Sequence, residues 1–349
     1  MNKVLFILKR REDYNHVLHS SHLGLSTGLF NSASFMCDML NKSGVHSKLV
    51  VVPDNNVIDR EVTRFQPTHV IIEALWVVPQ KFAILQKLHP NVKWIIRLHS
   101  ELPFLAGEGM SMDWIADYMS FKNLYLGINA PRMMSEVETY VTAKYGKEKM
   151  KDKLIYLPNY YPQDYKYKKL DKSKDIIHIG CFGAIRPLKN HMVQAIAAVK
   201  FAESIGKKLY FHINSGRIEM KGEPVTNNLR ALFTELYDKG HRLINHTWTP
   251  REQFLELCAQ MDIGMQVSFS ETFNIVGADL VSQGVPLVGS DEIPWMCHSF
   301  SAEATESEDI YNKLMRTYKY SFINTKLNQI NLKLYTNKTR KIWVEYFKG

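Results

Sequence analysis

Short apolar runs alternate with amphipathic stretches through the first half of the chain. Runs rich in aliphatic and β-branched residues predict buried strands at 4–9, 47–52, 68–74, 92–98, 123–128 and 153–158. Between these runs, apolar residues recur at helical spacing over 28–44 and around positions 60, 84, 115 and 138. Strands separated by helices in this way predict right-handed βαβ units and a parallel sheet.

The same alternation returns in the second half of the chain. Expected strands lie at 175–184, 207–213, 242–246, 262–267 and 285–289, and expected helices at 191–206, around 232, 255 and 278, and from 306 to the end. The segment 159–175 is polar, basic and rich in tyrosine, and we interpret it as a linker. The pattern therefore predicts an α/β protein of two Rossmann-like, doubly wound domains that face a central cleft.

Length, cysteine usage and charge narrow the class of protein. A chain of 349 residues suits two domains, which we place at 1–163 and 164–325, with 326–349 as a terminal helix. Four scattered cysteines and the lack of a signal-like or membrane-spanning stretch favour a reduced, cytoplasmic protein. A net charge of +9 suggests a nucleotide, a nucleic acid or an acidic membrane as partner, although solubility alone explains it equally well.

Candidate binding residues follow the strand expected at 175–184. Ligands of doubly wound sheets bind at the carboxyl ends of the strands. Gly180 and Gly183 allow a ligand to approach the backbone, and Arg186 and Lys189 are spaced to meet one phosphate or diphosphate. Considered alone, the two cations are equally typical of a polar surface loop.

A second set of candidates follows the strand expected at 262–267. Glu271 lies in a serine-rich strand end, where it can meet sugar hydroxyls. A helix expected to begin at 273–276 offers unpaired backbone N–H groups to an anion, and Asp279 within it can accept hydrogen bonds from a ribose diol. Acidic residues near a helix start are also explained by the helix dipole alone.

The first half offers weaker candidates. His99 follows the strand at 92–98 and can bond a hydroxyl or a transferring group, although a structural histidine is commoner there. Gly24 and Gly28 lie in the segment that leads into the helix at 28–44, which can form a phosphate or acceptor loop. The chain has no D-x-D, GxSxG or HExxH motif, so we expect no metal, and a hydrolase is disfavoured.

These residues together resemble the GT-B glycosyltransferases, above all the large retaining class called family 4. Glu271 is followed by seven residues, then Asp279 and later the run GVPLV at 284–288, similar to the family pattern E-x7-E with G-x-P-V/L-V. The segment from Gly183 to Lys189 resembles its G-x-x-R loop with a nearby lysine. A strand-end histidine and the order SE, YG and LPN towards the end of the first domain complete a likeness that covers nearly the whole chain.

The resemblance implies a role for each candidate. The groups that would hold the donor diphosphate are Gly183, Arg186, Lys189 and the backbone N–H groups of Asn274, Ile275 and Val276. Asp279 would bind the ribose, and Glu271 and His99 would contact the donor sugar. Trp248 would lie by the nucleobase, and Gly28 would line the site from the first domain. Asp279 is one methylene shorter than the family's glutamate. The terminal helix at 326–349 would return to the first domain.

The resemblance also implies a reaction. A retaining, metal-independent glycosyltransferase without a cofactor would move a hexose or pentose from a nucleotide sugar, with UDP-sugar favoured, to a hydroxyl. Attack and departure would occur on the same face of the sugar. The leaving phosphate would take the acceptor's proton, so that no protein nucleophile is required.

The acceptor stays open between two alternatives, and a third hypothesis needs no acceptor. The whole sequence also resembles small glycosyltransferases of large tailed bacteriophages, which implies a hydroxymethylated pyrimidine in DNA that is flipped out of the duplex, with the enzyme in the host cytoplasm. A basic face with apolar residues at 110–121 instead suits a membrane-surface enzyme that modifies an envelope glycan or lipid. A GT-B epimerase of nucleotide sugars would need no acceptor. The oligomeric state is not determined by the sequence.

Overall fold

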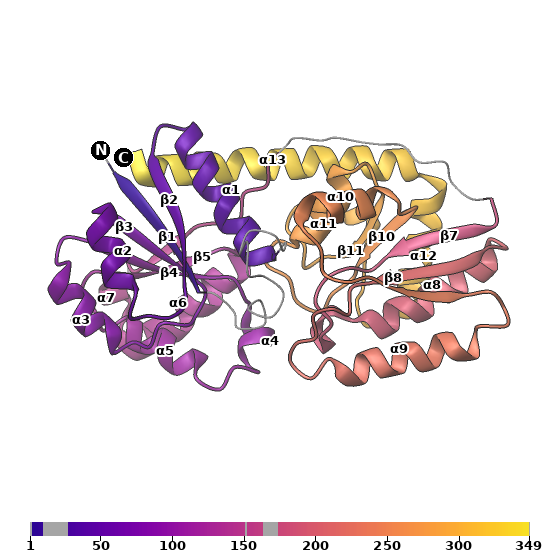
Figure 1. Cartoon of the computed structure of the whole chain (residues 1–349), viewed down its shortest axis with the longest axis horizontal. Helices are drawn as coiled ribbons and strands as arrows, with labels where there is room; N and C mark the ends of the chain where they lie inside the picture. Colours follow the sequence, from indigo (N-terminus) through magenta and orange to yellow (C-terminus); the bar gives the residue numbers. More distant parts are fainter. Residues whose placement is uncertain (1, 10–26, 151, 163–173, 349) are drawn as a thin grey trace. The chain divides into compact units, whose positions relative to one another are not determined.

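The computed structural model describes residues 2–9, 27–150, 152–162 and 174–348, and the chain divides into two compact units (Figure 1). Unit 1 holds the described residues up to 162 together with the end of the chain from Thr336. Unit 2 holds the described residues from 174 to Tyr335. The boundary expected at 163/164 falls within 163–173, which lies outside the described residues.

Unit 1 is built on a six-stranded parallel sheet with the order β2-β1-β3-β4-β5-β6. The strands are β1 (Lys3–Lys9), β2 (His46–Val52), β3 (His69–Glu73), β4 (Lys93–Leu98), β5 (Leu124–Ile128) and β6 (Leu154–Tyr156). The helices are α1 (Gly28–Lys42), α2 (Ile58–Phe65), α3 (Lys81–Leu88), α4 (Leu102–Leu105), α5 (Ser111–Tyr118), α6 (Pro131–Tyr145) and α7 (Lys147–Met150). Strand order reverses between β1 and β3, which makes that point the topological switch of the sheet.

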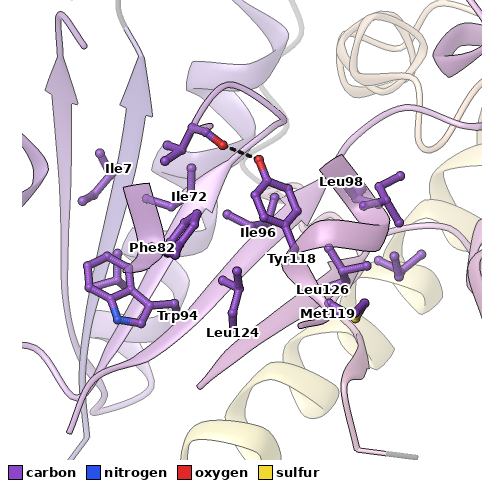
Figure 2. Packing of buried hydrophobic residues seen from close by; sticks show 14 of the residues in the cluster. Ile7, Ile72, Phe82, Trp94, Ile96, Leu98, Tyr118, Met119, Leu124 and Leu126 are labelled. Carbon is purple, nitrogen blue, oxygen red and sulfur yellow. Dashed lines mark hydrogen bonds between the residues drawn. The ribbon is translucent and has the colours of Figure 1, made fainter. Parts of the chain in front are cut away.

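Apolar side chains cover both faces of this sheet, as parallel strands require. On one face, the ring of Phe82 packs edge-on against Trp94 and Tyr118, with 5.7 Å between centroids in each pair (Figure 2). The Tyr118 hydroxyl donates a hydrogen bond to the Val77 carbonyl, which satisfies its polar end inside the core (Figure 2). Residues of α1 and of the chain's last turns pack on the other face.

Unit 2 holds a second six-stranded parallel sheet with the order β12-β11-β10-β7-β8-β9. The strands are β7 (Ile176–Gly180), β8 (Lys208–Ile213), β9 (Arg242–Asn245), β10 (Ile263–Gln266), β11 (Leu287–Ser290) and β12 (Ser301–Ala302). The helices are α8 (His191–Ser204), α9 (Glu223–Glu235), α10 (Arg251–Ala259), α11 (Ile275–Ser282), α12 (Ser307–Lys319) and α13 (Ser321–Lys348), with short 3-10 turns at Pro187–Lys189 and His298–Phe300. Counted within the unit, the strand order is that of dinucleotide-binding folds, with its switch point between β7 and β10.

The long helix α13 contributes to both units. Near its start, Asn324 exchanges hydrogen bonds of 2.8 Å with the backbone N–H and carbonyl of Leu287 in unit 2. Near its end, the Trp343 indole donates to the Pro158 carbonyl at 2.9 Å and stacks on Phe6 in unit 1. The terminal helix therefore belongs to unit 1 from Thr336 onward.

The predicted fold class is confirmed, with a few local corrections. The strand expected at 175–184 ends at Gly180, because Gly183 adopts a φ of +117° and the chain leaves the sheet there. Asn159 and Tyr161, at the start of the segment that we interpreted as a linker, are instead buried in unit 1. The sequence pattern did not predict β12, which has only two residues.

Candidate functional site

Two loops meet at the switch point of unit 2, one after β7 and one after β10. Asn190 donates from its side chain to the Val267 carbonyl at 3.0 Å, and the Phe269 N–H donates to the Leu188 carbonyl at 2.9 Å. The Val267 N–H donates to the Gln194 side chain at 2.9 Å. These bonds hold the loop of Arg186 and Lys189 against the loop of Glu271, so the structure brings both predicted sets of residues together.

Lys189 and Glu271 form an ion pair between the two loops. Their side chains are only 11% and 8% exposed. Burial lowers the pKa of Lys189, and the neighbouring Glu271 carboxylate opposes that shift. An anion that enters here can replace the carboxylate as the partner of the lysine, because an ammonium held in a poorly solvated place needs a negative partner.

A second cation lies beside this pair. Arg186 contacts Glu219 at 3.4 Å, and Glu219 also contacts Arg217. His191 starts α8 close to both Arg186 and Lys189, and burial together with these two charges lowers its pKa to about 3. Both ring nitrogens of His191 are buried and have no hydrogen-bond partner among the described residues. A neutral imidazole therefore stands behind the cationic loop.

The start of α11 is fixed by side-chain hydrogen bonds. Asn274 takes a left-handed conformation with φ of 60°, and its side-chain oxygen accepts from the Gly277 N–H at 2.7 Å. Its amide donates to Gln266 at 3.0 Å, and Gln266 donates to the Phe182 carbonyl at 3.0 Å. The helix therefore begins at Ile275, two residues later than the sequence suggested, and Asn274 acts as its cap rather than as a helical residue.

The loop that contains Gly183 lies directly beside the start of α11. A Cβ placed on Gly183 would come 3.9 Å from the Cγ2 atom of Val276. The first N–H groups of α11, at Ile275 and Val276, have no acceptor within their own helix. Gly183, Arg186, Lys189, Glu271 and the start of α11 thus form one cluster, whose chemistry suits an anion next to a hydroxyl-rich group.

Asp279 occupies a different setting from Glu271. It is buried, and the Arg251 guanidinium at the start of α10 lies 2.7 Å from its carboxylate. The sequence motifs did not point to Arg251, although it opens α10 only three residues after Trp248. Any ribose that bound Asp279 would share the carboxylate with this arginine.

Trp248 connects to the cluster through a row of charges. The Arg217 guanidinium lies 5.6 Å from the centre of a Trp248 ring, a cation–π arrangement. Arg217 shares Glu219 with Arg186, so the row runs from Trp248 to the diphosphate candidates. Trp248 is therefore linked to Arg186 through Arg217 and Glu219.

In unit 1, His99 belongs to a buried charged network. Its Nε2 contacts the carboxylate of Glu73, which also accepts from Arg97 at 3.2 and 3.3 Å. Burial alone would raise the pKa of Glu73, but Arg97 and His99 hold it below its usual range. Burial lowers the pKa of His99 against the opposing effect of Glu73. Nε2 of His99 is therefore engaged by the Glu73 carboxylate.

Sequence reasoning missed the partners of His99. Arg97 also donates to the Leu157 carbonyl at 3.1 Å and to Asn159, and Ser32 donates to Asn159 at 2.9 Å. Glu73 is the last residue of β3 and Arg97 the last but one of β4, and a charge that follows three apolar residues of a buried strand was the available signal. Gly28 begins α1 after the cap residue Thr27; the loop that precedes it lies outside the described residues.

Two general features of the described residues complete the picture. No group of three or more histidine, cysteine, aspartate or glutamate side chains there is arranged to hold a metal ion. None of the described helices has the length and apolar content needed to span a bilayer.

Comparison with known proteins identifies the fold. The chain superimposes over 100% of its length on 98% of sucrose-phosphate synthase from Thermosynechococcus elongatus, with a TM-score of 0.71 and 10% identity. It matches all of Anabaena HepE, solved with UDP and glucose, with a TM-score of 0.65 and 12% identity. With 98% of its own length it covers 97% of the UDP-forming trehalose-phosphate synthase of Burkholderia xenovorans, with a TM-score of 0.65 and 10% identity.

The chain has the GT-B fold. No protein-family model and no curated protein matches it in sequence. At 10–12% identity the structural likeness establishes the fold alone, and the function has to be argued from the residues of the site.

Proposed function

We propose that the protein is a retaining glycosyltransferase that moves a sugar from a nucleoside diphosphate sugar, preferably a UDP-sugar, to a hydroxyl acceptor. The observation that carries this proposal is the Lys189–Glu271 pair at the switch point of unit 2, next to the capped start of α11. A GT-B neighbour solved with UDP and glucose supports the choice of ligand.

The donor diphosphate would exchange the internal ion pairs for its own. Lys189 would turn from Glu271 to a phosphate, and Arg186 would release Glu219 in the same way. The N–H groups of Ile275 and Val276 would add hydrogen bonds, with Gly183 allowing close approach. Glu271, released from the lysine, would accept hydrogen bonds from the hydroxyls of the donor sugar.

The rest of the nucleotide would follow the charges already described. Asp279 would accept from the ribose hydroxyls while it stays paired with Arg251. Trp248 would stack on the base, with Arg217 holding the indole in place. His99 in unit 1 would contact the donor sugar.

The chemical step would depend on stabilising the leaving group. The bond between the anomeric carbon and the diphosphate oxygen breaks, and the acceptor oxygen forms the new bond on the same face. The acceptor's proton passes to the departing phosphate. Negative charge therefore grows on the diphosphate, where Arg186, Lys189 and the helix N–H groups stand, and each such donor contributes about 3 kcal/mol to the barrier reduction.

The deciding experiment follows nucleotide release by mass spectrometry with a panel of UDP-, GDP- and ADP-sugars. We expect one UDP-sugar to be consumed, with the sugar transferred to an acceptor or slowly to water, and Glu271→Ala to reduce the rate at least about a hundredfold. Interconversion of the sugar without nucleotide release would identify an epimerase. No binding and no turnover of any donor would overturn the proposal.

A further inference from the structure

The first half of α13 carries an apolar stripe on its outer side. Ile323, Leu327, Ile330 and Leu334 follow one another at intervals of four, three and four residues, which places them on one face of the helix. Their exposed fractions are 49%, 38%, 53% and 63%, and the adjacent Phe322 is 72% exposed. Isolated exposed apolar side chains are ordinary, but four on one helix face, with Phe322 beside them, form a continuous patch.

The inner side of the same segment is polar. Asn324 is bonded to both backbone groups of Leu287, Asn328 accepts from the Cys297 N–H at 2.8 Å, and Gln329 donates to the Val281 carbonyl at 3.0 Å. A surface helix normally turns its apolar face inward. Here these buried amides hold the helix in the opposite orientation, so the apolar stripe cannot turn into unit 2 without leaving them unsatisfied.

Charge around the stripe has a single sign. The sequence contains no aspartate or glutamate between Asp309 and Glu345. Over the same stretch it carries eight basic residues, namely Lys313, Arg316, Lys319, Lys326, Lys333, Lys338, Arg340 and Lys341. Lys326 and Lys333 are seven residues apart and flank the stripe along one side.

We propose that this face of α13 docks on the surface of an anionic lipid bilayer. A bilayer interface buries apolar side chains of a helix that lies in its plane and attracts the lysines beside them through its acidic headgroups. Duplex DNA would pair with the lysines but would offer nothing to the five apolar side chains. A second copy that packed through the same face would cover the apolar side chains but would offer the lysines no acidic residue of its own α13 before Glu345.

The inference bears on the acceptor only if the proposed function holds. A glycosyltransferase that rests on an acidic membrane through α13 would meet acceptors carried by lipids or by membrane-attached glycans. Docking itself requires neither a donor sugar nor turnover, so it can be tested without assuming the function.

The test is flotation of the full chain with vesicles of phosphatidylcholine alone or with 30% phosphatidylglycerol. We expect binding to the anionic vesicles at least about tenfold tighter than to the neutral ones. Ile330→Ser with Leu334→Ser should weaken it about tenfold or more, and Lys326→Gln with Lys333→Gln roughly fivefold per lysine.

Unit 1 offers a matched control. Ile84 and Leu88 in α3 have the same four-residue spacing and are 53% and 54% exposed. Ile84→Ser with Leu88→Ser should leave vesicle binding unchanged. Circular dichroism and thermal unfolding verify that each variant is folded.

Three results would overturn the proposal. The first is equal binding to neutral and anionic vesicles, or none to either. The second is an equal loss in the α13 and α3 variants. The third is a dimer in sedimentation velocity that dissociates in the Ile330→Ser, Leu334→Ser variant, which would assign the stripe to a second copy of the chain. Failure of nucleotide release in the donor panel would leave the vesicle result standing.

Discussion

Each unit has an ion pair near the carboxyl ends of two neighbouring strands of its sheet, yet the two pairs differ in what surrounds them. In unit 1, Glu73 and Arg97 are fully buried, and each is satisfied by partners within the unit. In unit 2, Lys189 and Glu271 keep part of their surface exposed and stand beside a helix start. Similar side chains therefore serve different purposes.

The extent of burial decides whether one partner of an ion pair can be exchanged for a ligand. A fully buried pair cannot open without leaving an uncompensated charge, so it acts as a frame. The Glu73–Arg97 pair is such a frame, and it orients His99. A pair that keeps part of its surface exposed can release one partner when a ligand supplies the same charge, and the proposed function requires that exchange of Lys189–Glu271.

The largest effect is expected in the frame of unit 1. Arg97→Met should lower the free energy of unfolding by about 3–5 kcal/mol, because Glu73 would stay buried without its cation. Arg97 also lies 5.1 Å from the Trp343 ring at the end of α13, so the loss should extend to that contact. Urea denaturation measures the change. A loss below about 1 kcal/mol would show that this pair is as exchangeable as the one in unit 2.

Lys189→Ala should have the next largest effect, on catalysis rather than on stability. We expect kcat for nucleotide release to fall about a hundredfold to a thousandfold, because the departing diphosphate loses one cation. Lys189→Arg should restore part of the rate, and both variants should lose less stability than Arg97→Met, because Lys189 and Glu271 keep part of their surface exposed. A large drop in unfolding temperature with little change in kcat would reverse the assignment of the two pairs.

Acid should lower the stability of unit 2 more than that of unit 1. The pKa of His191 and of His212 is lowered to about 3 by burial, and that of His69 in unit 1 to about 4. As pH falls below 6.5 the unfolded chain binds protons that the folded chain refuses, so stability is complete above 6.5 and is lost towards 3. At pH 5 the loss is about 2 kcal/mol for each histidine.

Hydrogen exchange followed by peptide mass spectrometry between pH 7.5 and 5 tests this expectation unit by unit. His191→Leu should flatten the pH dependence of unit 2, whereas substitution of the exposed His298 by glutamine should not. Equal protection of unit 2 at both pH values would contradict the expected burial of neutral imidazoles.

The smallest expected effect concerns the base. Trp248→Leu should raise the Kd for UDP about fivefold through lost ring contact, while leaving the Kd for pyrophosphate unchanged. Isothermal titration with both ligands measures the two constants. Equal weakening for UDP and pyrophosphate would place Trp248 by the phosphates and would separate it from the base.

Much of the site's position followed from local pattern. The alternation of strands and helices predicted two parallel sheets, and the rule for strand ends placed Arg186, Lys189 and Glu271 where the structure has them. The assignment of each to a ligand group stays a prediction. Glu73 and Arg97 escaped notice, because side chains that end apolar strands show no motif and their pairing depends on the register of neighbouring strands.

The fold class and the loops that hold the candidate residues could be predicted from the sequence, because the spacing of apolar residues and the placement of glycines act over a few residues. Only the tertiary structure decided which charges pair. Lys189 and Glu271 are 82 positions apart, and Arg251 reaches Asp279 from another helix. It also decided the orientation of α13. An amphipathic pattern shows that a helix has two faces, but the amides bonded to Leu287, Cys297 and Val281 determine which face is buried.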